Sequence, residues 1–129
     1  MYNIKVKLLL GRVDMTDYLV KYAHWCERSD LDEATRKELL EMKGNDGEIK
    51  ERFFCDLEFG TGGLRGVIGA GTNRINQYMI RKTTKGYAEY IKKAGKEACE
   101  RGVVIAHDNR RFSIEFAQNT AGVLAANGI

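Results

Sequence analysis

The stretch FGTGGLRGVIGAGTN, from Phe59 to Asn73, places six glycines and one arginine within fifteen residues. No other part of the 129-residue chain has this composition. Before it, apolar residues recur at helical spacing; after it, helical and strand-like patterns alternate. The glycine-rich stretch therefore predicts the place where a helical leader ends and an α/β domain begins.

The leader contains three predicted helices. The first follows Met15, and the second covers residues 29–43, where Ser29 and Asp32 form a capping-box pattern. The third covers residues 48–57, with apolar residues at i, i+4 and i+8. We therefore expect a helical N-terminal segment over residues 15–58.

The first fourteen residues have a different pattern. Residues 3–10 alternate apolar and polar side chains, which is the period of a strand. The helical pattern begins only at Met15. We expect Met15 to be the natural start and residues 1–14 to be an extension or tag.

Residues 59–129 alternate strand and helix signals. Strands are predicted over 64–68 and 103–106, the second as a buried parallel strand, and helices over 76–101 and 113–126. Two strands cannot bury both faces of a sheet, so we expect the chain to stop inside its domain. The predicted class is α/β, with N-terminal helices followed by part of a three-layer α/β/α domain. That domain would have a mixed sheet and be truncated at its C-terminal end.

Composition excludes several classes of function. Hydrophobic residues make up 43% of the chain and charged residues 30%, which is typical of a soluble globular protein. No apolar run approaches the length of about 18 residues that a membrane span needs. The net charge of +3 is mild and the basic residues are spread along the chain, so no nucleic-acid partner is expected. Three cysteines without a CxxC pair predict no zinc site, and we expect reduced thiols in the cytoplasm.

The glycine-rich stretch has three interpretations. As a flexible linker, its glycines would carry no chemistry. As a nucleotide loop it fails, because the Rossmann pattern meets Arg65 or Arg74 at its third glycine and the Walker A ending is missing. As a phosphate site, its glycines would let backbone N–H groups approach an anion while Arg65 supplies a bidentate charge. Only the third interpretation uses Arg65 and the glycines together.

The segment LEFGTGGLRGVIGAGTNRIN resembles the N-terminal signature of the α-D-phosphohexomutases, the phosphoglucomutase/phosphomannomutase superfamily. The pattern Phe-Gly-Thr-x-Gly-Leu/Ile-Arg-Gly is matched by Phe59, Gly60, Thr61, Gly63, Leu64, Arg65 and Gly66. The resemblance continues through YMIRKTTKGYAEYI, GVVIAHDNRRFS and FAQNTAGVLAANGI, so it covers roughly residues 15–129. The helical leader resembles the phosphoglucomutase-2-like branch. Two departures are Gly62, where Ala or Ser is usual, and His107, where Tyr or Gly is usual.

The resemblance implies a sugar-phosphate mutase that interconverts hexose 1-phosphate and 6-phosphate through a phosphoserine and a bisphosphorylated sugar. Arg65 is then the catalytic, phosphoryl-stabilising residue. Substrate-binding residues implied in this way are Thr61, Gly62, Gly63, Arg65, Asp108 and Arg110. Mg²⁺ and glucose 1,6-bisphosphate are expected for the full-length enzyme, with no metal ligand in this chain.

The family's serine loop, Thr-Ala-Ser-His-Asn-Pro, does not occur in the sequence and is expected beyond Ile129. We therefore expect the chain to be inactive without the missing C-terminal domains, and its exposed strand edges favour self-association.

Alternatives stay open at this point. One is a phosphopentomutase of the same superfamily, and another is a non-catalytic module that binds a phosphorylated ligand. For Asp108 and Arg110, a local ion pair or a capping contact for the last helix is as good an interpretation as substrate contact. Charges on Arg74, Arg81 and Lys82 are expected to be solvated.

Overall fold

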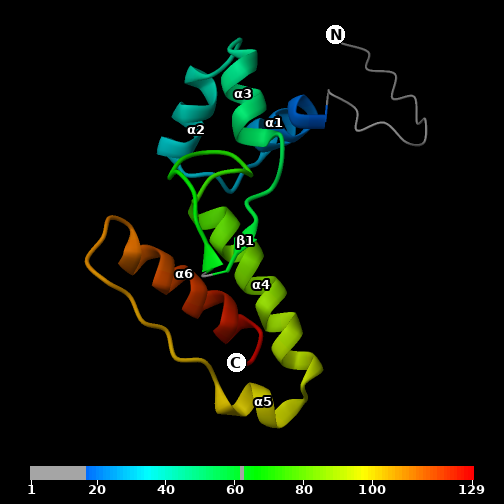
Figure 1. Cartoon of the computed structure of the whole chain (residues 1–129), viewed down its shortest axis with the longest axis vertical. Coiled ribbons are helices and arrows are strands. Elements are labelled where there is room, and N and C mark those ends of the chain that lie inside the picture. The colour runs from blue at the N-terminus through cyan, green and yellow to red at the C-terminus, as the bar shows by residue number, and fades with distance from the viewer. Residues whose placement is uncertain (1–16, 62) are drawn as a thin grey trace, which may run out of the picture.

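The computed structural model describes residues 17–61 and 63–129. Its elements, in chain order, are α1 (Asp17–Glu27), α2 (Glu33–Glu41), α3 (Asp46–Phe53), β1 (Phe59–Gly60), β2 (Gly63–Leu64), α4 (Gln77–Lys93), α5 (Lys96–Arg101) and α6 (Ser113–Ala126). Figure 1 shows α1, α2 and α3 gathered at one end of the long helix α4, with α6 alongside α4 and α5 at the other end. The predicted strand over 3–10 and the predicted extension over 1–14 lie outside the described residues.

The start of α2 corrects the predicted capping box. Its N-cap is Asp32, whose carboxylate accepts a hydrogen bond from the Thr35 backbone N–H at 2.8 Å and another from the Thr35 hydroxyl at 2.8 Å. Ser29 lies three residues before this cap. The carboxylate satisfies one of the free N–H groups of the first turn, so the helix begins where Asp32 can reach them.

The third helix also differs from its predicted bounds of 48–57. It begins after Asn45, whose side-chain oxygen accepts from the Glu48 N–H at 3.2 Å, and it ends at Phe53. Asparagine is a common N-cap because its side-chain oxygen accepts a hydrogen bond from a free N–H group of the first turn, so α3 begins earlier than the apolar spacing predicts.

The core joins the leader to the segment after the glycines. Phe53 is completely buried and meets Trp25 and Tyr22 edge to face, each with ring centroids 5.6 Å apart. The buried cluster comprises Trp25, Leu31, Leu39, Met42, Ile49, Phe53, Ala70, Tyr78 and Met79. Because three of these come from after residue 59, the core crosses the predicted boundary between leader and domain.

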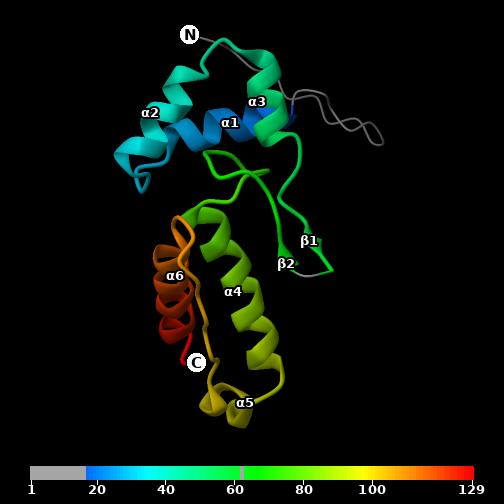
Figure 2. The same ribbon diagram turned by 60° about the vertical axis from the view of Figure 1, so that its left-hand side comes forward.

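Helices α4 and α6 pack side by side (Figures 1 and 2). The predicted helix over 76–101 starts as expected, with the Asn76 side chain accepting from the Met79 N–H at 2.9 Å. It is interrupted at Gly95, where φ is +98° and the chain turns before α5. Glycine adopts this left-handed geometry without the steric cost of a side chain. The predicted bounds of α6 are confirmed.

Strand pairing is sparse. β1 and β2 form an antiparallel hairpin in which Phe59 pairs with Leu64, and Ile68 makes one parallel bridge to Ile75. The predicted parallel strand over 103–106 is wrong, because residues 102–108 belong to no strand and Val104 is 97% exposed. No strand among the described residues lies beside this segment to complete a ladder. The structure still agrees with the predicted α/β class, because helices are followed by one antiparallel pairing and one parallel bridge.

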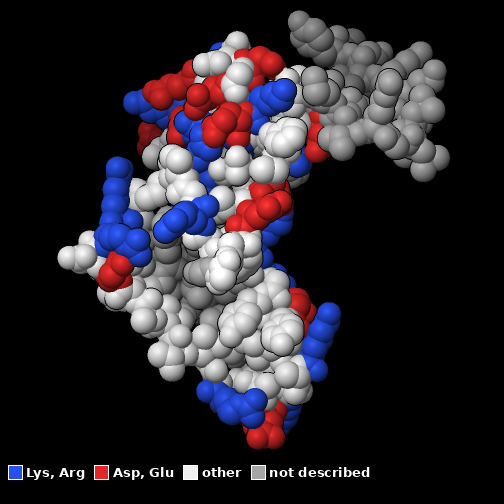
Figure 3. All heavy atoms as spheres, viewed as in Figure 1, with Lys and Arg blue, Asp and Glu red and all other residues white. Residues whose placement is uncertain are grey.

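One face of α4 and α6 is left open. A groove of about 630 Å³ lies between them and β1, lined mainly by apolar side chains such as Phe59, Met79 and Leu124. Figure 3 shows few charged residues on this face below the three-helix end.

Candidate active site

The glycine-rich stretch consists of two structurally different halves. In the first half, β1 pairs with β2 and Arg65 follows directly; Phe59 is 69% exposed, and Gly63 and Leu64 are half-buried. Residues 66–76 fold back against α2 and α3, where Ala70, Thr72 and Asn76 are buried. The two halves therefore need separate explanations.

The second half is a packed structural loop. The Leu57 N–H donates to the Thr72 carbonyl at 2.8 Å, and the Asn73 N–H donates to the Arg52 carbonyl at 2.9 Å. At Gly71, φ is +129° and a Cβ atom would lie 2.7 Å from the Arg52 carbonyl oxygen. Glycine is required here because the backbone of α3 passes too close for a side chain. This glycine serves packing rather than ligand binding.

Arg65 lies in the first half and is exposed. Within residues 17–61 and 63–129, no hydrogen bond or ion pair to its side chain is found. The neighbouring backbone is open as well, since a Cβ atom at Gly63 would meet nothing within 4 Å and Thr61 is exposed. Gly62 lies outside the described residues. A guanidinium that has no partner among the described residues is available to bind an anion in bidentate geometry.

Arg74 contrasts with Arg65, and its predicted solvation is wrong. Its side chain is only 9% exposed, and both terminal nitrogens of the guanidinium bind the Glu51 carboxylate. The loop after Gly71 lies on α3, which carries Arg74 into contact with Glu51 of that helix. Arg81 and Lys82 are exposed, as predicted, although each has a partner, Asn119 and Asp56 respectively.

Asp108 and Arg110 are paired with each other. The Arg110 Nε donates to Asp108 at 2.6 Å, and the Arg110 backbone N–H donates to the same carboxylate at 3.0 Å. That backbone bond and then the guanidinium lower the pKa of Asp108 below its ordinary value. The Asp108 N–H donates to the Ser113 hydroxyl at 3.1 Å, which ties the pair to the start of α6. The structure thus shows the local ion pair; substrate contact by these residues stays a prediction.

The predicted site residues fall into two separate places. Figure 2 shows the hairpin and the segment that leads into α6 on opposite sides of α4. In the part of the chain that the structure describes, no hydrogen bond or ion pair joins Thr61, Gly63 or Arg65 to Asp108 or Arg110. The hairpin alone forms the candidate phosphate site.

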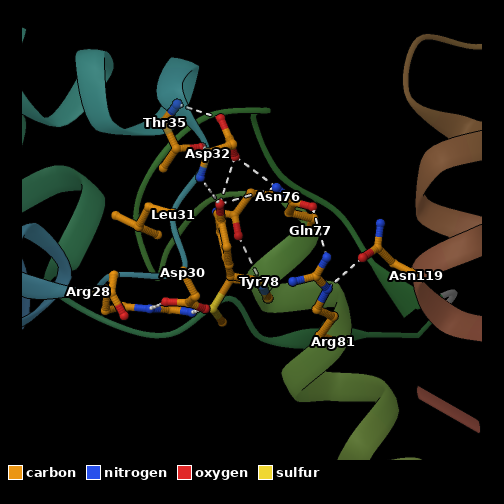
Figure 4. Close-up of polar contacts among 12 residues, drawn as sticks. Arg28, Asp30, Leu31, Asp32, Thr35, Asn76, Gln77, Tyr78, Arg81 and Asn119 are labelled. Carbon is orange, nitrogen blue, oxygen red and sulfur yellow. Dashed lines mark hydrogen bonds and ion pairs between the residues drawn. The ribbon is translucent and has the colours of Figure 1, made fainter. Parts of the chain in front are cut away.

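A second groove, of about 480 Å³, lies where the first turns of α2, α4 and α6 meet, and both polar and apolar side chains line it. Asp32, at its edge, accepts hydrogen bonds from the Tyr78 hydroxyl at 2.7 Å and from Gln77 Nε2 at 2.8 Å (Figure 4). Burial favours a higher pKa for Asp32, but hydrogen bonds from the Thr35 N–H, Tyr78, Thr35 and Gln77 outweigh burial and lower that pKa to about 2. These contacts join α2 to α4 and are structural.

The sequence did not reveal this junction. Arg111 and Glu38 line the groove from segments more than 70 residues apart in the chain. No local motif signals such a contact, because residues so distant in sequence share no periodicity.

The described residues contain no cluster of side chains suited to binding a metal ion. Between Asp17 and Ile129, Gly62 aside, no group of three or more His, Cys, Asp or Glu side chains gathers to hold an ion. Of the chain's two serines, Ser113 accepts from Asp108 and Ser29 is an exposed loop residue. Neither serine lies on the hairpin of Arg65.

Comparison with known proteins assigns the fold to a family. Residues 56–129, more than half of the chain, match "Phosphoglucomutase/phosphomannomutase, alpha/beta/alpha domain I". The chain belongs to this family. The matched region contains the hairpin, α4, α5 and α6, so membership confirms both the resemblance in the glycine-rich stretch and the predicted α/β class.

Curated relatives in this family carry several mutase names. A "Probable phosphoribomutase" of Schizosaccharomyces pombe is 40% identical over 101 residues, which is 77% of this chain and 17% of the relative. The human "Phosphopentomutase" is 32% identical over 115 residues, 84% of this chain and 18% of the relative. A "Phosphoglucomutase" of Staphylococcus aureus is 37% identical over 105 residues, 81% of this chain and 18% of the relative.

The chain thus spans less than a fifth of the length of these curated relatives. Among solved structures, none matches it significantly. Of the helices described, none is long and apolar enough to cross a membrane.

Proposed function

We propose that this member of the phosphoglucomutase/phosphomannomutase family carries the phosphoryl-binding arginine of a sugar-phosphate mutase. The observation behind the proposal is Arg65, an exposed guanidinium that lacks a partner among the described residues and directly follows the glycine-containing hairpin of β1 and β2. In the proposed reaction a phosphoryl group moves between two hydroxyls of a sugar through a phosphoserine and a bisphosphorylated sugar.

Arg65 would act by charge. During phosphoryl transfer, negative charge spreads over the non-bridging oxygens of the phosphoryl group. A guanidinium donates two parallel N–H bonds to two of those oxygens and is always protonated. Because Arg65 has no carboxylate to neutralise it in the described structure, its full charge is available to the phosphoryl group. The glycines on either side leave room for the sugar phosphate to approach the backbone.

The nucleophilic serine and Mg²⁺ are assigned to other parts of the complete polypeptide. Among the residues that the structure describes, none fits a metal site, and neither serine of the chain lies beside Arg65. The 129-residue chain is proposed to be inactive by itself.

The proposed substrate is a hexose phosphate, interconverted between the 1- and 6-positions with glucose 1,6-bisphosphate as activator. A second candidate is a pentose 1-phosphate, and it rests on the relatives named phosphoribomutase and phosphopentomutase. Arg65 serves both substrates equally, because it binds the phosphoryl group and not the sugar.

A substrate panel tests this proposal. The complete polypeptide that carries this chain should be assayed with glucose 1-phosphate, mannose 1-phosphate and ribose 1-phosphate, each with Mg²⁺ and the matching bisphosphate. We expect phosphoryl migration in at least one hexose phosphate. Turnover of ribose 1-phosphate alone would replace the hexose assignment with the pentose one. Binding of sugar phosphates without any turnover would contradict the mutase proposal and support a binding module.

A further inference from the structure

The helical leader contains a partly buried ion pair, Arg52 with Glu38, that contacts the glycine-rich loop. Arg52 of α3 donates from Nη1 to Glu38 Oε1 at 2.5 Å, and from Nε to Glu48 Oε1 at 2.6 Å. Its side chain is only 16% exposed. Burial alone lowers the pKa of a guanidinium, but the bonds to Glu38 and Glu48 raise the pKa of Arg52 above its ordinary value. Arg52 therefore keeps its positive charge.

Both partners of this pair also bind residue 70. Arg52 Nη1 donates to the Ala70 carbonyl at 3.1 Å, while Glu38 Oε2 accepts from the Ala70 N–H at 2.9 Å. Ala70 is buried, so water does not reach its backbone N–H and carbonyl groups. Glu38 and Arg52 supply the hydrogen bonds that these two groups need. This holds the loop in one position on α2 and α3.

The loop in turn fixes both ends of the hairpin. On the entry side, the Leu57 N–H donates to the Thr72 carbonyl at 2.8 Å, two residues before β1. On the exit side, the Ile75 N–H donates to the Val67 carbonyl at 2.8 Å, two residues after Arg65. Asn76 ties the loop to itself, donating to the carbonyls of Gly69 at 2.8 Å and Gly71 at 2.9 Å.

From these contacts we infer that Arg52 and Glu38 are positioning residues for Arg65. They hold the loop of residues 66–76, and this loop holds the hairpin from which the Arg65 guanidinium projects. The inference rests on the proposed function, because it assigns the leader a role in that same site. A shift of about 1 Å in a reacting group can lower a rate about a hundred-fold, so a loop held this firmly matters to the chemistry.

The test is a double-mutant cycle in the complete polypeptide. kcat, KM and Tm are measured for Arg52→Ala, Arg65→Ala and the double variant. If Arg52 acts through Arg65, Arg52→Ala lowers kcat about ten- to a hundred-fold in the wild-type background and less than about three-fold in the Arg65→Ala background. Arg52→Lys should recover part of the rate, because an ammonium keeps the charge but not the fork of donors.

Control variants separate positioning from loss of stability. Ile49 lies on α3, as Arg52 does, and is only 4% exposed. Ile49→Val removes one methylene from the core and leaves the contacts between Arg52, Glu38 and the loop in place. It should lower Tm while leaving kcat unchanged at temperatures well below Tm. Glu38→Gln should behave like Arg52→Ala. Hydrogen exchange of the 129-residue chain gives a readout apart from activity: amides of residues 69–75 should exchange faster in Glu38→Gln and not in Ile49→Val.

The outcomes are distinct. An equal loss of kcat from Arg52→Ala in both backgrounds, or no loss in either, overturns the positioning role. A normal kcat for Arg65→Ala overturns the proposed function itself, whatever the Arg52 variants do.

Discussion

Gly71→Ala should strongly destabilise the 129-residue chain. At this position φ is +129°, a region that residues with a side chain rarely occupy, at a cost of about 1–3 kcal/mol. The new Cβ would also lie 2.7 Å from the Arg52 carbonyl oxygen and 2.9 Å from its Cβ. Overpacking of this kind costs about a further 1–3 kcal/mol, since backbone must move. We expect a total loss of about 2–6 kcal/mol in the free energy of unfolding.

Thermal melting followed by circular dichroism measures this loss. For a chain of this size each kcal/mol lowers Tm by several degrees, so Tm should fall by about 10 °C or more. Gly86→Ala is the matched control, because Gly86 lies within α4 and a Cβ there would meet nothing within 4 Å. It should raise stability by about 0.5–1 kcal/mol, as alanine favours a helix. A Gly71→Ala variant that melts with the wild type would refute the close packing of this loop on α3.

Three further outcomes are expected. Phe53→Ala should cost about 3–5 kcal/mol in chemical denaturation because Phe53 is completely buried, whereas Phe54→Ala, at a residue 59% exposed, should cost less than about 0.5 kcal/mol; equal losses would contradict the core. The pKa of Asp32 is lowered from 3.8 to about 2, so its contribution to stability is complete above pH 3.8 and is lost as pH falls toward 2. The difference in Tm between wild type and Asp32→Asn should therefore shrink as pH falls from 3.8 toward 2. A difference in Tm that does not change with pH would show that the Asp32 carboxylate charge is not what stabilises the fold. The purified 129-residue chain should not turn over glucose 1-phosphate with glucose 1,6-bisphosphate and Mg²⁺; activity that co-purifies with the chain would contradict the proposed need for the rest of the polypeptide.

Elements with local signals were predictable from the sequence. The last helix has its predicted bounds, and α4 starts at Asn76, because periodicity and capping side chains are local information. The α/β class was predicted from the alternation of strand and helix signals after residue 59, and the family from the seven matched positions of the glycine-rich motif.

Features that depend on distant partners were not predictable. The segment over 103–106 has the apolar run of a buried strand, but a strand also needs a neighbour, and Val104 has none among the described residues. Arg74 has the sequence surroundings of a surface charge, and only the folding of its loop onto α3 buries it against Glu51. The hydrogen bonds to Ala70 are also between distant positions: Arg52 lies 18 residues before Ala70, and Glu38 lies 32 residues before it.

The candidate site was predicted in part. The motif located Arg65, and the structure shows its side chain exposed on the hairpin. The motif did not indicate that the described glycines of the stretch divide between the hairpin and a packed loop. That division depends on how closely the backbone of α3 approaches Gly71.

The most direct test of the role of Arg65 is the rate and the melting temperature of one variant, Arg65→Ala, in the complete polypeptide. Loss of an electrostatic donor to a transition state typically lowers turnover about a hundred- to a thousand-fold. Because Arg65 is exposed and contacts no partner in the described structure, Tm should stay within about 2 °C of the wild type. Arg65→Lys should recover only part of the rate. A near-normal rate together with a clearly lower Tm would show that Arg65 is structural and would contradict its assignment to the phosphoryl group.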